Sequence, residues 1–200
     1  MQLLFSASNA LNKWLKADLP RLPKEAGKQA GVNSLFSNAA QMSWQVHIID
    51  NQYQSEHKTI IACEAHSRFT VFMAADSRFP LDELNAQLKI HWQFVLVEML
   101  ERQQLMPRSE ILLLLSQLDK LAFTTQWAKN TDCSISGHIT DASLYVTQTL
   151  QEHKLTRLPE ALSLDLACYL NSQVKRVKSR KEKFIPVERL LSYCRKIIEK

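Results

Sequence analysis

The sequence predicts an α+β protein in which a small antiparallel β-meander of three to five strands is covered by a long helix. Three short segments with strand-like composition follow one another between residues 44 and 73. A long segment with apolar residues at helical spacing comes next. Further helical segments fill the C-terminal half. The helices therefore outnumber the strands while the strands cluster, which is typical of the α+β class.

The strands of the meander are expected at Trp44–Asp50, His57–Glu64 and Arg68–Met73. In the first of these, apolar residues alternate with Gln45 and His47, the period of a half-buried strand. The segments between the strands are shorter than the dozen or so residues that a parallel crossover needs, so the strands are expected to be antiparallel. A meander of this kind has an apolar face that needs a cover.

The remaining elements are expected as follows. A short strand at Gln2–Ser6 precedes a helix that runs to about Lys16 and is capped by Ser8 or Asn9. Residues 18–38, which hold two prolines and two of the three glycines, form a loop or mobile segment. Pro80 opens the long covering helix, Leu81–Leu105, which ends before Pro107.

Shorter elements follow the long helix. Ser109 is expected to cap a helix at Glu110–Leu118, and Leu121–Ala128 has the composition of a further strand. A helix at Ile139–His153, with Thr140 as a candidate N-cap and Leu144 facing inward, precedes two helices that follow Pro159 and Pro186. We expect a single domain over residues 1–200, with residues 175–185 as a basic connector to the last helix.

Composition favours a cytoplasmic protein. Apolar residues make up 46% and charged residues 22% of the chain, an ordinary globular balance. The N-terminus lacks the features of a signal peptide, and the four cysteines contain no CxxC pair, which favours reduced thiols. Three glycines exclude a P-loop and a dinucleotide fingerprint, and no common catalytic or calcium motif is present. We expect no cofactor and no membrane partner.

The charge is local. The chain has a formal net charge of +5, and the segment 175–183 alone carries six bases and one acid, so the remaining 19 bases and 19 acids balance. The six bases are Lys175, Arg176, Lys178, Arg180, Lys181 and Lys183. They are candidates for contact with nucleic acid or an acidic partner, because clustered bases bind phosphates without sequence preference. The alternative is a solvated connector between two helices.

The segment Cys133–Asp141 combines small and polar residues ahead of a predicted helix. A loop of this kind can present backbone N–H groups to an anion, with Ser134, Gly137, Arg68 and Arg78 as candidate anion-binding residues. The same segment holds Ser134, His138 and Asp141, the residue types of a hydrolytic triad, which geometry alone can establish. The alternative is a capping loop whose polar side chains satisfy the helix terminus.

A metal site is the less favoured interpretation of one further pair. Cys63 and His66 have ligand types and a spacing that zinc uses. A structural zinc site has a second closely spaced pair, which the sequence lacks, so Cys63 is expected to be a buried small side chain. No metal is therefore predicted.

One combination of segments resembles a small bacterial family of unknown function. It consists of Trp44 at the start of a strand, the Arg68–Phe72 segment, a long helix, and the pattern of Ser134, Gly137 and Asp141. The resemblance extends loosely from Met1 to Asn171. Cys133 stands where the family has a basic residue and Thr140 where asparagine is common, and these departures weigh against an inherited anion site. The resemblance implies no activity.

Two functions remain open from the sequence. The first is a non-enzymatic binding or adaptor domain whose basic strip contacts nucleic acid or an acidic protein. The second is a small enzyme, hydrolase-like or phosphate-handling, with its site near Ser134–Asp141.

Overall fold

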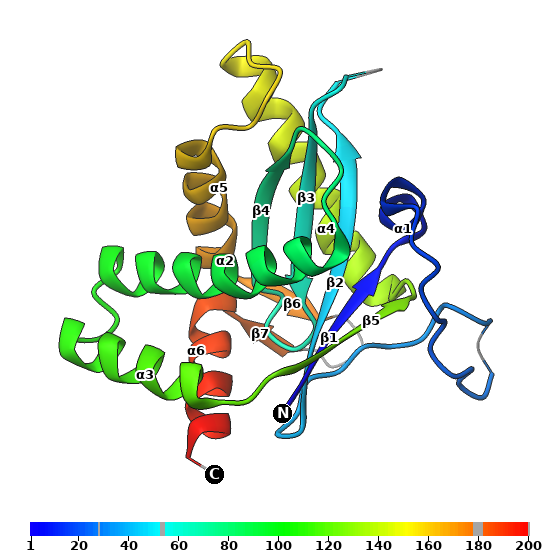
Figure 1. Ribbon diagram of the computed structural model, residues 1–200. Coiled ribbons are helices and arrows are strands. Elements are labelled where there is room, and N and C mark those ends of the chain that lie inside the picture. Colours follow the sequence, from blue (N-terminus) through cyan, green and yellow to red (C-terminus); the bar gives the residue numbers. More distant parts are fainter. Residues whose placement is uncertain (28, 53–54, 178–181, 200) are drawn as a thin grey trace.

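A five-stranded mixed sheet forms the centre of the computed structural model, which describes residues 1–200 except 28, 53–54, 178–181 and 200 (Figure 1). The strand order is β4-β3-β2-β1-β5. These strands are β1 (Gln2–Ala7), β2 (Gln41–Asp50), β3 (Lys58–Glu64), β4 (Thr70–Ala75) and β5 (Thr124–Lys129). The helices of the described residues are α1 (Asn9–Leu15), α2 (Leu81–Arg102), α3 (Arg108–Lys120), α4 (Cys133–Glu152), α5 (Glu160–Ser172) and α6 (Pro186–Ile198). The predicted α+β class is confirmed.

The sheet is antiparallel on one side only. Strands β2, β3 and β4 form a meander in which Trp44 lies opposite Glu64 and Ile61 opposite Phe72. Strand β1 instead pairs in parallel with both β2 and β5, so the prediction of a purely antiparallel sheet is wrong. Parallel neighbours require long connections, and the segments that precede β2 and β5 provide them.

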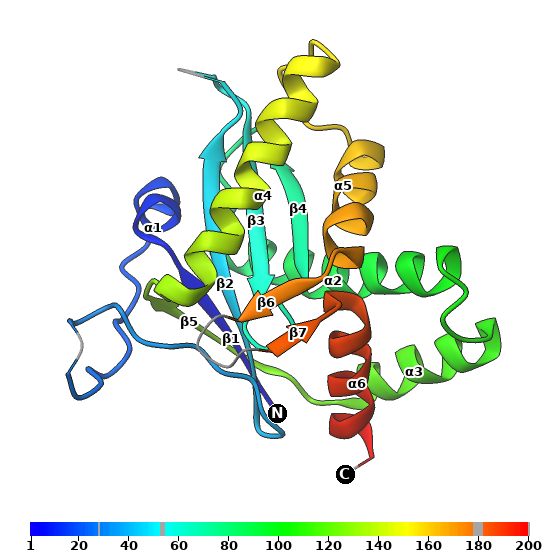
Figure 2. The same ribbon diagram turned by 180° about the vertical axis from the view of Figure 1, so that it is seen from behind.

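Helices α2 and α4 lie on opposite faces of the sheet (Figures 1 and 2). On the α2 side, the rings of Trp92 and Trp44 lie 5.9 Å apart and both are 1% exposed. On the α4 side, the buried residues are Ile135, Ile139, Ala142, Val146 and Leu150. No helix in the described residues is both long enough and apolar enough to span a bilayer.

A buried amide joins three strands of the sheet to the start of α4. The Nε2 atom of Gln45, in β2, donates to the carbonyls of Ser6 (2.9 Å) and Asn130 (3.1 Å). Its Oε1 atom accepts from the N–H of Asp132 at 2.9 Å. Because Ser6 lies in β1 and Asn130 directly follows β5, one side chain satisfies backbone groups from several elements that would otherwise be buried without a partner.

Asp132 determines where α4 begins. Its carboxylate accepts from the N–H of Ser134 at 2.7 Å, as an N-cap does, and from the N–H of Leu35 at 2.6 Å. The predicted start at Ile139 with Thr140 as N-cap is therefore wrong. The Thr140 hydroxyl donates to a carbonyl one turn back inside the helix, and Gly137 is a helical residue.

Two smaller predictions also differ from the structure. Helix α3 begins at Arg108 and its N-cap is Pro107, without a side-chain cap from Ser109. Leu144 is 57% exposed, because Ala142 and Val146 are the residues of that turn that are buried.

We predict that Trp92→Ala lowers the free energy of unfolding by about 3–5 kcal/mol, because it removes a large side chain that the surrounding core cannot replace. Leu112→Ala is the matched control, since Leu112 is 60% exposed on α3 and its loss is expected to cost less than about 0.5 kcal/mol. Urea unfolding followed by circular dichroism measures both. Equal losses in the two variants would contradict the contact between α2 and β2 as a main source of stability.

Candidate functional site

The basic strip forms a two-stranded ribbon between α5 and α6. Strands β6 (Lys175–Val177) and β7 (Glu182–Phe184) pair antiparallel, with Arg176 opposite Lys183 and Lys175 opposite Phe184. The sequence predicted a basic connector at residues 175–185, and its composition gave no strand signal. Lys178, Arg180 and Lys181 lie outside the described residues.

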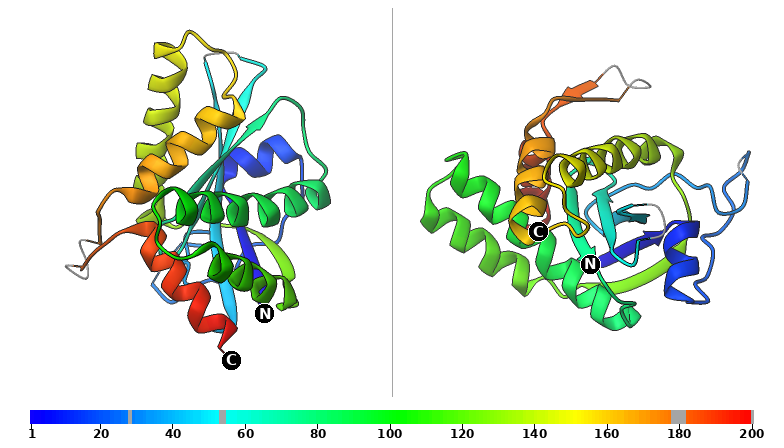
Figure 3. Two further views of the ribbon diagram at one scale, coloured as in Figure 1. Left: turned by 90° about the vertical axis from the view of Figure 1, so that its left-hand side faces the viewer. Right: turned by 90° about the horizontal axis from the view of Figure 1, so that it is seen from above.

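The two faces of the ribbon differ in charge and in contacts. Directly opposed residues share a face, so Arg176 and Lys183 lie together, and both are exposed. The other face carries Glu182 and Phe184, which contact Arg189 of α6 through an ion pair of 3.2 Å and a cation–π contact of 4.2 Å. The face with Glu182 and Phe184, which Lys175 shares, is thus anchored on α6, and the opposite face exposes Arg176 and Lys183. Figure 3 shows it extending away from α5 and α6.

Arg189 also ties the ribbon to the turn after β3. Its Nε atom donates to Nε2 of His66 at 3.1 Å. Burial and the nearby Arg189 lower the pKa of His66, so the ring is neutral and accepts this hydrogen bond. Cys63 is fully buried, and burial raises the pKa of its thiol to about 11. The described residues contain no group of three side chains suited to hold a metal ion.

Arg68 lies in the turn that joins β3 to β4. The Glu64 carboxylate holds this turn by accepting from the N–H groups of His66 and Ser67. Arg68 adopts φ = 61°, the left-handed region that costs a residue other than glycine about 1–2 kcal/mol. Its guanidinium is buried and donates to the Ala65 carbonyl and, at 3.1 Å, to Oγ of Ser134. Among the described residues it has no carboxylate partner.

Three positive or titratable groups gather between this turn, α4 and the ribbon. His138 is half-buried, and burial together with the charges of Arg68 and Lys175 lowers its pKa to about 4. Lys175 stands at the start of the ribbon, and its charge also acts on Cys63. Arg68, Ser134, His138 and Lys175 therefore form one cluster, hereafter the Arg68 cluster, at the root of the ribbon.

The structure brings together some of the predicted site residues and separates others. Ser134, His138 and Asp141 share one face of α4 by helical spacing. In the part of the chain that the structure describes, no hydrogen bond joins Ser134 to His138 or His138 to Asp141; the Ser134 hydroxyl accepts from Arg68 instead. Arg78 is exposed after the opposite end of β4. It therefore lies a whole strand away from the Arg68 cluster.

No family model, curated protein or solved structure matches this chain. The sequence indicates Arg68, Ser134 and His138 as candidates, but it does not indicate Arg189 or the effect of Lys175 on His138. No local pattern gives that information, because the effect of Lys175 on His138 depends on where the ribbon places this lysine.

We predict that acid lowers stability through His138. Its pKa is lower in the folded state than the ordinary value of 6.5, so the unfolded chain binds more protons between about pH 6.5 and 4. The free energy of unfolding should fall across this window by about 1–2 kcal/mol more in the wild type than in His138→Gln, allowing for solvent screening. Urea unfolding at several pH values measures this, and proton NMR follows the ring directly. Arg68→Gln should raise the pKa of His138, and an unchanged value would contradict the cluster.

Proposed function

We propose that the protein binds double-stranded DNA through the phosphate backbone, using the β6–β7 ribbon as its contact surface. The observation that carries this proposal is the face shared by Arg176 and Lys183, which is exposed and directed away from the anchoring contacts. The whole net charge of the chain is confined to this segment. A polyanion is the partner that such a face fits electrostatically.

The opposed pair Arg176 and Lys183 favours a bound anion on energetic grounds. Like charges directly opposite each other on neighbouring strands destabilise a two-stranded ribbon. The acid within the strip, Glu182, does not relieve this pair, because it lies on the other face and pairs with Arg189. A phosphate between or beside the two bases would remove the repulsion and release counterions from the DNA.

The shape of the ribbon favours duplex DNA over other nucleic acids. A two-stranded β-ribbon fits the major groove of B-DNA, whereas the major groove of duplex RNA is too narrow for side chains to enter. Single strands are bound through aromatic stacking platforms. The aromatic residue of the described ribbon, Phe184, lies under the Arg189 guanidinium at 4.2 Å and does not offer a free stacking face.

The Arg68 cluster lies at the root of the ribbon, with Lys175 on the face that also carries Phe184. Lys175 and Arg68 add positive charge there, and burial together with these charges lowers the pKa of His138 to about 4, so its ring is neutral at pH 7. The Ser134 hydroxyl already accepts from Arg68, so the guanidinium is held in place before any ligand arrives. We propose that the positive charges of this cluster strengthen the electrostatic attraction of the duplex to the root of the ribbon.

We predict that the double variant Arg176→Gln/Lys183→Gln binds a fluorescent DNA duplex at least about tenfold more weakly than the wild type in 50 mM salt, as measured by anisotropy. The slope of log K against log salt concentration should decrease in magnitude by about 1.8, since each phosphate contact contributes about 0.9. The matched control is Lys13→Gln/Lys120→Gln, which removes two exposed lysines from α1 and α3 and gives the same net charge.

Three competitors separate the proposal from its alternatives. Single-stranded DNA, duplex RNA and polyglutamate are titrated against the bound duplex. Polyglutamate that competes as well as duplex DNA would assign the ribbon to an acidic protein partner and overturn the proposal. Equal weakening in the test and control variants would mean that only overall charge matters, which would also overturn it.

A further inference from the structure

A second surface lies at the edge of the sheet, where β4 has β3 on one side only. The N–H of Glu64 donates to the carbonyl of Phe69 at 2.8 Å. This bond shows which residues of β4 direct their backbone N–H and C=O groups toward β3. Because the pattern alternates in an antiparallel pair, Val71 and Met73 bond to β3. The backbone groups of Thr70, Phe72 and Ala74 consequently point away from the sheet.

Side chains of α5 and α2 already occupy the first part of this edge. The Asn171 amide accepts from the N–H of Thr70 at 2.7 Å and donates to its carbonyl at 2.8 Å, the same two bonds that a neighbouring strand would make. The Phe72 carbonyl accepts from Oγ of Ser163 at 2.6 Å and is 2.7 Å from Nε2 of His91. A carbonyl cannot donate, so Nε2 carries the hydrogen; burial lowers the pKa of His91 and keeps the ring neutral.

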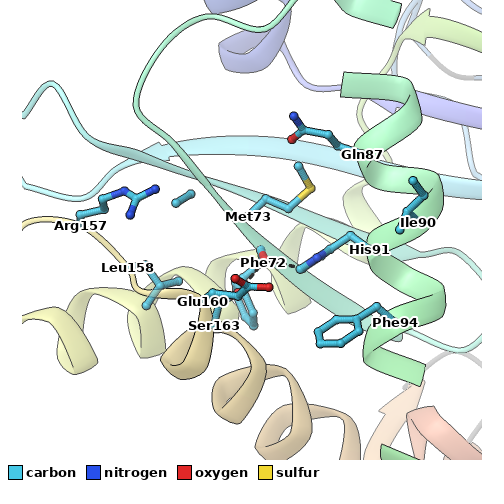
Figure 4. A pocket seen from close by; sticks show the side chains of 11 residues that line it. Phe72, Met73, Gln87, Ile90, His91, Phe94, Arg157, Leu158, Glu160 and Ser163 are labelled. Carbon is cyan, nitrogen blue, oxygen red and sulfur yellow. Dashed lines mark hydrogen bonds between the residues drawn. The ribbon is translucent and has the colours of Figure 1, made fainter. Parts of the chain in front are cut away.

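The rest of the edge opens into a groove between α2 and α5 (Figure 4), with a volume of about 570 Å³. Ala74 lines it and is half-buried. Phe72 is fully buried, so the accessible part of this edge is Ala74. No hydrogen bond from the described residues reaches the outward N–H and carbonyl of Ala74. Groups of this kind form a template for another strand.

The lining of the groove is mainly apolar, with polar side chains such as Gln87 and Ser163 among it. Met73 and Leu158 lie at its base and side, and two large side chains of α2 line it from the opposite wall (Figure 4). Those two, Ile90 and Phe94, are 66% and 38% exposed, which is unusual for residues of this size on a helix that also packs on the core. The ionic side chains at the groove, Arg157 and Glu160, have opposite signs, so the groove does not select a charged ligand.

We infer that this groove, hereafter the β4 groove, binds an extended peptide that adds to the sheet as a strand next to β4. Backbone N–H and C=O groups of an extended peptide match the open N–H and C=O of Ala74, and its alternate side chains match the apolar side chains of Ile90 and Phe94. Asn171 imitates such a strand at Thr70, so the edge already has the geometry of a paired strand. Helices α2 and α5 flank the groove. A folded domain would collide with these helices before it reached β4, whereas a single extended strand would not. This inference is independent of the DNA-binding proposal.

Selection from a phage-displayed library of random seven-residue peptides on the full chain tests the inference. We expect enrichment of sequences with apolar residues at alternate positions and no net charge preference. The enriched peptide, made synthetically, should bind Ile90→Ser about tenfold more weakly than the wild type, because Ile90 loses its apolar contact. Leu144→Ser is the matched control, since Leu144 is 57% exposed on α4, outside the groove, and should leave affinity unchanged.

A backbone-modified peptide separates strand addition from general apolar binding. The same peptide, N-methylated at alternate residues so that it cannot donate to the β4 edge, should lose at least about tenfold in affinity. Failure of the library to enrich any peptide, equal binding of the N-methylated peptide, or equal weakening by Ile90→Ser and Leu144→Ser would each overturn the inference.

Discussion

The position of α4 depends on the buried side chain of Gln45, because this one amide satisfies backbone groups of β1, of the residue after β5 and of the helix cap Asp132. A buried backbone group without a partner costs about 1–3 kcal/mol, so the three contacts act together to hold these segments in one arrangement. Asp132 then fixes the first turn of α4. The place of Ser134 and His138 beside Arg68 follows from that turn.

The sequence predicts the local parts of this fold well and the long-range parts poorly. The meander and the last helix were recognisable because alternation, helical spacing and Pro186 act within a few residues. The parallel pairing of β1 with β5 could not be recognised, since Gln2 lies opposite Thr124 and nothing near either residue indicates the other. The start of α4 was misplaced because Ser134, Gly137 and Thr140 are polar or small residues of a helix face directed away from the core.

The candidate site shows the same division. Arg68, Ser134 and His138 were named as single candidates, and Arg68 meets Ser134 only because the turn after β3 reaches the first turn of α4. The composition of residues 175–183 indicates the bases of the ribbon. The face of the ribbon on which each base lies depends on the register of β6 and β7. The β4 groove was not predicted at all, because an open strand edge is defined by what does not pair with it.

Four of the six histidines are buried enough to affect their titration. Burial lowers the pKa of each of four histidines, namely His47, His66, His91 and His138. These four rings are therefore neutral at pH 7 and add no charge to the field of the ribbon there. Salt concentration is the condition that controls this field, through screening.

The place of β1 between β2 and β5 has a consequence for the order in which the protein folds. Strand β1 is made first, yet one of its neighbours is β5, so this side of β1 cannot pair until residues 124–129 have been synthesised. Contacts between such distant residues are slow to form, because a long loop must close before they contribute. Until then, the β1 edge stays open on the nascent chain, and the meander and α2 are the parts able to assemble first.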